Sequence, residues 1–240
     1  MNIAIIGYGK MGKVIEKLAL ERGHHITVKI NSSNIGDFNK QYLTGTDVAI
    51  EFSTPEVGYE NVKHLIDWGI PTVSGTTGWK DKLRDINILA KQKETGFIYA
   101  SNFSLGVNLF FALNEYLAVL MNDKAYNVSV EEIHHTSKKD SPSGTAITLA
   151  EQIISNSSYM SWVNNDSDQN KTIPIVSKRE NPAPGTHTIS YKSSIDTINI
   201  QHIAHSREGF ALGAILAAEW IIGKTGVHTM KEVLGITTPQ

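Results

Sequence analysis

The residues best suited to chemistry lie within residues 131–146, which read EEIHHTSKKDSPSGTA. The segment contains two adjacent histidines, two adjacent lysines, an aspartate and a Ser-Pro-Ser-Gly-Thr run. An imidazole can donate a proton near neutral pH, and an ammonium group can neutralise a carboxylate. A histidine pair or a lysine pair taken alone is more often a solvated surface feature. Together, beside a helix start, they indicate a site that binds an anionic substrate and protonates it.

The patterns on either side predict a strand that leads into this segment and a helix that follows it. Tyr126, Val128 and Val130 alternate with other residues, which is typical of a half-buried strand. After the segment, apolar side chains recur at helical spacing at Ala146, Leu149, Ala150, Ile153 and Ile154. The histidines would therefore lie at the end of the strand and the lysines on the loop.

The start of this helix is expected to bind an anion. Ser141 is predicted to be the N-cap and Pro142 the first helical residue. The backbone N–H groups of Ser143, Gly144 and Thr145 would then be unsatisfied donors at the positive end of the helix dipole. A carboxylate could accept hydrogen bonds from them.

The run HHTSKKDSPSGTA resembles the HHxxKxDAPSGTA signature of the dihydrodipicolinate reductases of bacterial lysine biosynthesis, with Ser141 in place of the usual alanine. The resemblance implies an enzyme that uses NADH or NADPH to reduce 4-hydroxy-tetrahydrodipicolinate to tetrahydrodipicolinate, with loss of water, in the diaminopimelate and lysine pathway. It extends from Gly7 to roughly Gly223, and it is loosest between Ser155 and Pro184.

For such a reaction we expect His134 to be the general acid and Lys138 to be a proton donor or the partner of a substrate carboxylate. Lys139 and Asp140 are expected to be structural. No metal is expected, because the cofactor supplies the chemistry. The groups expected to bind the substrate carboxylates are His135, Ser143, Gly144 and Thr145.

A second motif, near the start of the chain, predicts a dinucleotide-binding fold. An apolar run at residues 2–6 is followed by GYGKMG at residues 7–12 and by a helical pattern that ends near Gly23. The glycines of GxGxxG allow a tight turn and let a pyrophosphate approach the helix start. The family often has one more residue here, as GxxGxMG, so this loop is shorter.

Strand-like and helical segments alternate through the first hundred residues, which predicts a Rossmann-type doubly wound parallel sheet. Strands are expected at residues 26–30, 47–52, 70–73 and 97–100, and helices at residues 57–68 and 80–93. Ligands bind beyond the C-terminal ends of such strands. The GTTG and SNFSLGVN segments resemble the family's GTTG and ANFSxGVN, which implies that Thr76, Thr77, Asn102 and Phe103 line the nicotinamide side of the cofactor.

The second strand ends at Asn31, Ser32 and Ser33, where a dinucleotide fold selects its cofactor. None of these is acidic or basic, and Lys29 within the strand could face either way. We therefore predict that both NADH and NADPH are used, with a modest preference. The full set of expected cofactor-binding residues is Gly7, Gly9, Lys10, Met11, Gly12, Asn31, Ser32, Phe52, Gly75, Thr76, Thr77, Ser101, Asn102, Phe103, Arg207 and Phe210.

The second half is expected to form an α+β domain on a mixed sheet. A helix at residues 107–121 precedes the histidine segment, and residues 156–171 are expected to be an exposed loop. Strands are predicted at residues 173–178, 186–192 and 195–204. An apolar helix at residues 210–222 should return to the first domain.

The expected domains are residues 1–103 for the dinucleotide, residues 104–207 for substrate and oligomerisation, and residues 208–240 as a returning segment. Hinges are expected near residues 103–106 and 206–209. Gly185-Thr186-His187-Thr188 resembles the family's GEHT turn, while His202 and His205 are expected to be structural or surface groups.

Composition excludes several classes of function. A net charge of −2 argues against a nucleic-acid-binding surface, and the absence of cysteine excludes disulfides and thiolate metal sites. The nine histidines show no metal-ligand spacing. No apolar run is long enough to cross a membrane, so a cytoplasmic protein is expected, and the resemblance implies a homotetramer.

Two other functions remain open at this point. Another nicotinamide-dependent amino-acid or imine dehydrogenase could share the first domain, and a non-catalytic dinucleotide-sensing protein could keep the glycine motif. The first would not respond to dipicolinate analogues. The second would have no reason to keep His134, Lys138 and the Ser-Gly-Thr helix start together.

Overall fold

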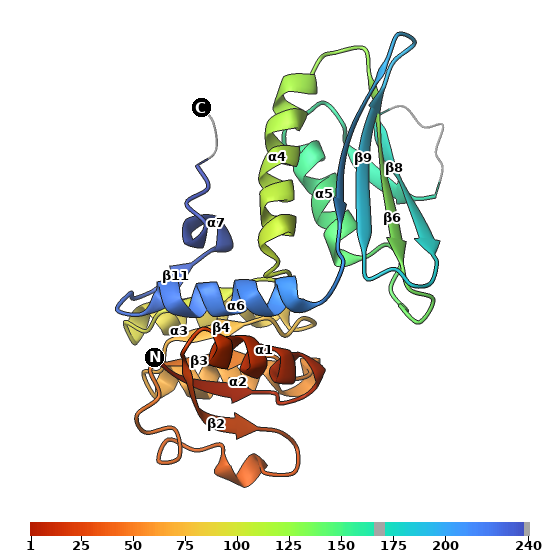
Figure 1. Ribbon diagram of the computed structural model, residues 1–240. Coiled ribbons are helices and arrows are strands. Elements are labelled where there is room, and N and C mark those ends of the chain that lie inside the picture. Colours follow the sequence, from red (N-terminus) through yellow and green to blue (C-terminus); the bar gives the residue numbers. More distant parts are fainter. Residues whose placement is uncertain (166–170, 238–240) are drawn as a thin grey trace. The chain divides into compact units, whose positions relative to one another are not determined.

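The computed structural model describes residues 1–165 and 171–237, which form two units, each with its own β-sheet (Figure 1). The first unit contains Met1–Leu105 and Arg207–Ile236, and the second contains Gly106–Ser206. The chain thus passes between the units near Leu105 and Ser206. No helix in the described ranges is long and apolar enough to cross a membrane.

The first unit is a doubly wound parallel sheet, as predicted. Its six strands lie in the order β11-β5-β4-β3-β1-β2, and every neighbouring pair is parallel. The strands are β1 (Asn2–Ile6), β2 (His25–Ile30), β3 (Val48–Glu51), β4 (Thr72–Ser74), β5 (Phe97–Tyr99) and β11 (Val227–His228). The apolar sequences of the central strands β1 and β3 fit strands that are buried on both faces.

Helices cover both faces of this sheet. Residues of α1 (Lys10–Glu21) and α6 (Glu208–Ile221) share one core with β1, β3 and β4, so the predicted return of the apolar C-terminal helix is confirmed. On the opposite face lie α2 (Pro55–Asp67) and α3 (Leu83–Gln92). A Cβ at Gly213 would lie 1.7 Å from the carbonyl oxygen of Phe103, so the glycine is what allows α6 to approach so closely. The smaller elements are η1 (Ile35–Asp37), η2 (Lys80–Lys82) and α7 (Met230–Val233).

The second unit is the predicted mixed sheet, with helices α4 (Leu105–Met121) and α5 (Gly144–Ser155) on one side of it (Figure 1). Its strand order is β10-β9-β6-β8-β7, in which β9 pairs antiparallel with β6 and β10 while β8 pairs parallel with β6 and β7. The strands are β6 (Asn127–His134), β7 (Ser161–Asn164), β8 (Thr172–Arg179), β9 (Thr186–Lys192) and β10 (Thr197–Ile203).

The prediction of a loop over residues 156–171 is wrong where β7 forms. Trp162 packs on the core of the second unit, and β7 pairs in parallel register with β8. Pairing with the next strand, β8, therefore outweighs the polar composition of the surrounding residues. Residues 166–170 of the same prediction lie outside the described residues.

The predicted start of α5 is also wrong. Ser143, not Ser141, is the N-cap: its backbone is extended and its hydroxyl accepts a hydrogen bond from the Ala146 N–H. Pro142 precedes the helix, since α5 begins at Gly144. The side chain that can reach the N3 amide decides the cap.

Candidate active site

The glycine motif of the first unit forms a turn that only glycine permits. Gly7 has φ +97°, and a Cβ there would lie 2.0 Å from the carbonyl oxygen of Phe52. The N–H groups of Gly7 and Tyr8 donate to the Ile30 carbonyl, at 2.9 and 2.8 Å. These bonds hold the turn against the end of β2.

The turn leaves the start of α1 open for an anion. Gly9 is the N-cap and supplies no side-chain cap, and a Cβ at Gly9 would meet nothing within 4 Å. A Cβ at Gly12 would lie 2.7 Å from the Gly7 carbonyl oxygen, so Gly12 lets the helix pack on the turn. The first turn carries no acidic residue. Exposed N–H groups at the positive end of a helix suit a phosphate.

A cavity of about 410 Å³ opens beside this helix start. It brings together the glycine motif, the residues after β3 and the Gly75–Thr77 segment after β4, because the ends of parallel strands meet at one edge of the sheet. Its walls consist of Gly9, Lys10, Met11, Phe52, Ser53, Pro55, Gly75, Thr76 and Thr77. Ser53 and Pro55 were not expected there.

Several expected cofactor-binding residues do not line this cavity. Phe103 is only 1% exposed, and its ring packs on Phe52 in the core, with ring centroids 5.8 Å apart. Its ring is therefore a core side chain and does not form part of this wall. The other expected residues that are not part of the wall are Gly7, Gly12, Asn31, Ser32, Ser101, Asn102, Arg207 and Phe210.

A buried glutamate, Glu51, holds the segments that form the wall of this cavity. The carboxylate of Glu51 accepts hydrogen bonds from the hydroxyls of Ser53, Ser74 (2.6 Å) and Thr76 (2.7 Å) and from the Ser53 N–H (3.0 Å). Burial raises the pKa of Glu51 above its ordinary value, although these hydrogen bonds oppose the shift. The Thr76 hydroxyl is thus engaged in fixing the loop. In the sequence, this role is indicated by a single carboxylate, Glu51, at the end of an otherwise apolar strand.

The structure decides which way Lys29 faces. Its ammonium group lies 3.0 Å from Glu16 Oε1 and 5.1 Å from the centroid of the Tyr8 ring. The Tyr8 hydroxyl donates to the same glutamate. Lys29 therefore lies beside the glycine turn, where the carboxylate of Glu16 offsets its positive charge.

In the second unit, the register of the sheet aligns a row of polar side chains on the face that carries α5. Glu132 on β6 lies opposite His187 on β9 and Ser177 on β8, and His202 on β10 lies opposite His187. His134 continues the buried face of β6 formed by Val128, Val130 and Glu132. The strand-end position predicted for the histidines is confirmed.

Glu132 is the centre of this row. Its fully buried carboxylate accepts hydrogen bonds from the Ser143 N–H (3.1 and 3.2 Å to its two oxygens) and from the Ser177 hydroxyl (2.8 Å). Arg179 forms an ion pair with it at 3.3 Å. Burial alone would raise the pKa of Glu132, but the surrounding donors hold it well below the ordinary range. The carboxylate is therefore ionised.

The two imidazoles lie on the other side of this carboxylate. His134 Nδ1 is 3.3 Å and His187 Nε2 is 3.7 Å from Glu132 Oε2. The rings meet edge to face with their centroids 5.1 Å apart. Burial lowers the pKa of His187, so this imidazole is neutral near neutral pH. The other nitrogen of His134 faces Gly185, where a Cβ would lie 3.2 Å from Nε2.

The loop after β6 is held by short-range contacts. Lys138 Nζ contacts both carboxylate oxygens of Asp140, at 2.8 and 2.7 Å, and lowers the pKa of that carboxyl group against the effect of burial. His135 Nδ1 lies 2.8 Å from the Ser137 hydroxyl. Arg179 donates to the Asp140 carbonyl at 2.6 Å, which ties the loop to β8.

The start of α5 differs from the expectation that three backbone N–H groups, those of Ser143, Gly144 and Thr145, would all be open to an anion. The Ser143 N–H is occupied by Glu132, and the Ser143 hydroxyl lies 3.3 Å from His187 Nε2. Gly144 remains open, since a Cβ there would meet nothing within 4 Å. The sequence analysis missed Glu132, Arg179 and His187, although His187 lies in the GTHT segment.

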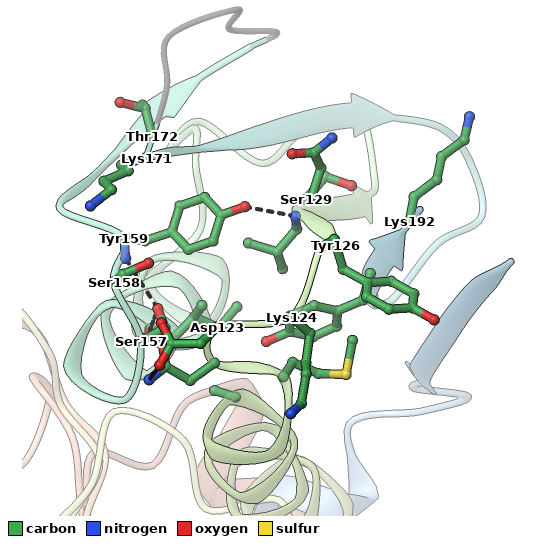
Figure 2. Close-up of a pocket in the computed structure, with 18 of the residues that line it drawn as sticks. Asp123, Lys124, Tyr126, Ser129, Ser157, Ser158, Tyr159, Lys171, Thr172 and Lys192 are labelled. Carbon is green, nitrogen blue, oxygen red and sulfur yellow. Dashed lines mark hydrogen bonds between the residues drawn. The ribbon is translucent and has the colours of Figure 1, made fainter. Parts of the chain in front are cut away.

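A larger cavity, of about 760 Å³, lies elsewhere in the second unit, between the end of α4 and the start of β6. The Tyr159 hydroxyl accepts from the Val128 N–H in its wall (Figure 2). Its three lysines, Lys124, Lys171 and Lys192, point in different directions in Figure 2, so they form no shared cation cluster. None of the expected site residues lines it.

Comparison with known proteins identifies relatives along the whole chain. The family model "Dihydrodipicolinate reductase, N-terminus" matches residues 1–103, and "Dihydrodipicolinate reductase, C-terminus" matches residues 106–234. A Christiangramia forsetii protein named 4-hydroxy-tetrahydrodipicolinate reductase is 50% identical over 240 residues, which cover 98% of each chain. A Neisseria meningitidis protein of the same name is 32% identical over 266 residues, again covering 98% of each chain.

Solved structures show the same fold. A dipicolinate-bound dihydrodipicolinate reductase from a Paenisporosarcina species superposes with a TM-score of 0.78 at 22% identity, covering 99% of each chain. An amine dehydrogenase from Mycobacterium smegmatis has a TM-score of 0.65 at 9% identity, covering 96% of this chain and 95% of that one. At these identities the likeness concerns the fold alone.

Proposed function

The chain belongs to the dihydrodipicolinate reductase family, and we propose on that basis that it catalyses the NAD(P)H-dependent reduction of 4-hydroxy-tetrahydrodipicolinate, with loss of water, in the diaminopimelate and lysine pathway. The observation that supports this most directly is the second site, where His134 lies beside the ionised Glu132 and next to the start of α5. A proton donor close to an anion-binding helix start matches a substrate that carries carboxylates and accepts a proton.

The first unit would hold the cofactor, which supplies a hydride when bound. The helix start at Gly9, Lys10 and Met11 would bind the pyrophosphate, and Phe52 and Thr77 would form the adjacent wall. The open position at Gly9 supports this assignment, because a phosphate needs close access to backbone N–H groups. By sequence these are residues 1–103, with residues 208–240 returning to the same unit.

The second unit, expected at residues 104–207, would hold the substrate. His134 would protonate it through Nε2, the nitrogen that faces away from Glu132. Lys138 would exchange Asp140 for a substrate carboxylate, while His135 and the backbone of Gly144 and Thr145 would bind the substrate's carboxylates. Ser143 would not bind the substrate directly. Its hydroxyl would cap the helix and its N–H group would hold the carboxylate of Glu132.

The experiment that tests the proposed function is a binding and activity panel. Thermal shift is measured with NADH, NADPH and pyridine-2,6-dicarboxylate, alone and in pairs, and reduction is followed by loss of cofactor absorbance. Stabilisation by both ligand types and turnover of the substrate are expected. Another dehydrogenase would respond to the cofactor but not to the dicarboxylate. A dinucleotide sensor would bind cofactor without turnover.

The second unit would also make the protein a homotetramer through its sheet. The strand positions that alternate with the buried face of β9 are Thr186, Thr188 and Ser190, which are only partly exposed. On β10, Ile203 is 50% exposed and lies opposite Thr186. A sheet face away from α4 and α5, with partly apolar side chains, supports packing against a second copy. The family resemblance and the dependence on a nicotinamide cofactor support a cytoplasmic enzyme.

A further inference from the structure

The ionised carboxylate of Glu132 has no chemical step assigned to it above, although it contacts His134, Ser143, Ser177, Arg179 and His187. We propose that Glu132 is the positioning residue of this site: it orients the imidazole of His134 and fixes the start of α5 beside it. This proposal rests on the proposed function, because it assigns a role toward the same general acid.

The geometry gives His134 one defined orientation. Nδ1 faces Glu132 Oε2 at 3.3 Å, an ion-pair distance without the alignment of a hydrogen bond. Nε2 faces the space that Gly185 leaves open. Hydrogen bonds of catalytic groups often tighten only when substrate is bound. A carboxylate behind one ring nitrogen leaves the other nitrogen to exchange the proton, and third groups that orient a histidine act in this way.

The same carboxylate fixes the substrate-binding segments relative to His134. It accepts from the Ser143 N–H, which sets the first turn of α5. It also pairs with Arg179, whose Nη2 donates both to this carboxylate and to the Asp140 carbonyl on the loop that carries Lys138. One side chain therefore links the general acid, the helix start and the lysine loop.

The charges around His134 come from several elements. Glu132 on β6 is the buried anion, and Arg179 on β8 and Lys138 on the loop are cations. Asp140 pairs with Lys138, and His187 on β9 and His202 on β10 both have lowered pKa values through burial. Because the two other imidazoles favour the neutral form, the negative charge of Glu132 acts chiefly on His134 and Arg179.

The ligand atoms of Glu132, His134 and His187 all lie within 4.8 Å of one another, which is also close enough for three ligands of a metal ion. The contacts of the carboxylate argue against a cation. Glu132 already accepts from Ser143 and Ser177 and pairs with the guanidinium of Arg179 at 3.3 Å. A divalent ion would have to displace these donors and approach a fixed positive charge. The cluster therefore favours a proton over a metal.

The test is E132Q, which keeps the size of the side chain and an acceptor for the Ser143 N–H but removes the charge. We expect kcat to fall at least about tenfold, but by less than the ~10²–10⁴-fold expected for loss of the acid itself. The Kd for pyridine-2,6-dicarboxylate should change by less than about threefold. The KM for the imine should also change less than kcat, because the glutamine still holds the start of α5 through the Ser143 N–H.

Two further variants separate positioning from simple folding. S177A removes one hydrogen bond to Glu132 without changing its charge, and its kcat should stay near wild type. E132D keeps the charge but withdraws it from His134, because its side chain is shorter, so its kcat should fall while the Kd for pyridine-2,6-dicarboxylate stays near wild type. If E132Q does not fold by circular dichroism, an unchanged kcat in E132D overturns the proposal.

The other outcomes are equally decisive. A Kd for pyridine-2,6-dicarboxylate that rises in E132Q as much as kcat falls overturns the positioning role. A loss of kcat in S177A as large as in E132Q shows that the effect is one of general packing. Absence of substrate reduction by the wild type contradicts the proposed function itself, whereas normal wild-type turnover with an unaffected E132Q contradicts only the role of Glu132.

Discussion

At the scale of single residues, the chemistry that each side chain can perform depends on whether its polar atoms already have hydrogen-bond or ion-pair partners. Lys138 is paired with Asp140 and Ser143 with Glu132, while His134 keeps Nε2 beside the space at Gly185. Residue type alone marks all of them as candidates. Their partners distinguish a proton donor from a helix cap and from a group that must first exchange its ion pair.

H134Q tests the proton donor. We expect kcat to fall by ~10²–10⁴-fold with a smaller change in KM for the imine, because an acid acts in the transition state. The matched control is H25Q, which changes an exposed histidine at the start of β2 and should retain wild-type kinetics. Steady-state kinetics at saturating cofactor measure both variants. A near-normal kcat in H134Q would contradict the assignment of His134 as the proton donor.

At the scale of elements, the proposed anion sites of both units are helix starts. Helix α1 begins without any side-chain cap, which leaves its amides to a ligand. Helix α5 begins with a serine cap, Ser143, and the N–H group of that serine donates to the buried carboxylate of Glu132. The first arrangement suits a pyrophosphate, and the second leaves a narrower site at Gly144.

S143A compared with S141A tests which serine caps α5. Loss of a cap typically costs ~1 kcal/mol, so S143A should lower the free energy of unfolding by about that amount. S141A should change it by less than about 0.5 kcal/mol, as expected for an exposed residue outside such a contact. Urea unfolding followed by circular dichroism gives both values. Equal losses would contradict the assignment of Ser143 as the cap.

We expect the end of β2 to set the cofactor preference. The Asn31 Oδ1 accepts from the N–H and hydroxyl of Ser33, and an aspartate could keep both bonds. Wild type should use NADH and NADPH within about 1–2 kcal/mol, or roughly tenfold, of each other. N31D should shift kcat/KM toward NADH, because a carboxylate repels a 2′-phosphate. S32R should shift it toward NADPH, with a steeper dependence on salt.

The ratio of kcat/KM for the two cofactors, measured at two ionic strengths, decides the cofactor prediction. A thousandfold preference in the wild type would contradict it. Such a preference would point to Lys29, which lies next to the glycine turn but is paired with Glu16.

At the scale of the whole molecule, the first unit is completed by a segment that returns more than a hundred residues later. Glu219 on α6 pairs with Arg22 at 2.8 Å and with His24 at 2.7 Å, which fastens the returning helix to the end of α1. Burial opposes ionisation of Glu219, but these two partners lower its pKa below the ordinary value. Protonation of Glu219 weakens its contacts with Arg22 and His24, so the stability of this unit depends on pH.

E219Q should reduce the free energy of unfolding at pH 7 by about 1 kcal/mol or less, as expected for a partly exposed ion pair. A carboxylate with a lowered pKa contributes stability above its unfolded pKa and loses it as pH falls through the folded pKa. The difference from wild type should therefore shrink below pH 4.5, the ordinary value, and vanish at lower pH. E208Q, at the exposed Lys17–Glu208 pair, is the control. A pH-independent difference would contradict this linkage.

Assembly is the other property of the whole molecule. We expect a tetramer in mass photometry at working concentration. T188R, which places a charge at the centre of the uncovered face of β9, should dissociate it, whereas K192A at the exposed end of the strand should not. A monomeric wild type would contradict the proposed packing of sheets.

The sequence by itself determined the parallel first sheet, the mixed second sheet and the positions of His134 and the glycine motif. These follow from local periodicity, glycine spacing and a long specific signature, which a single stretch of chain contains. It did not determine β7, the cap of α5 or the row of Glu132, His187, Ser177 and His202. Those depend on which strands lie side by side and in what register, and that is a property of contacts between distant segments. The burial of Glu132 and the pairing of Lys29 with Glu16 were decided in the same way, because the tertiary structure alone determines which charges meet.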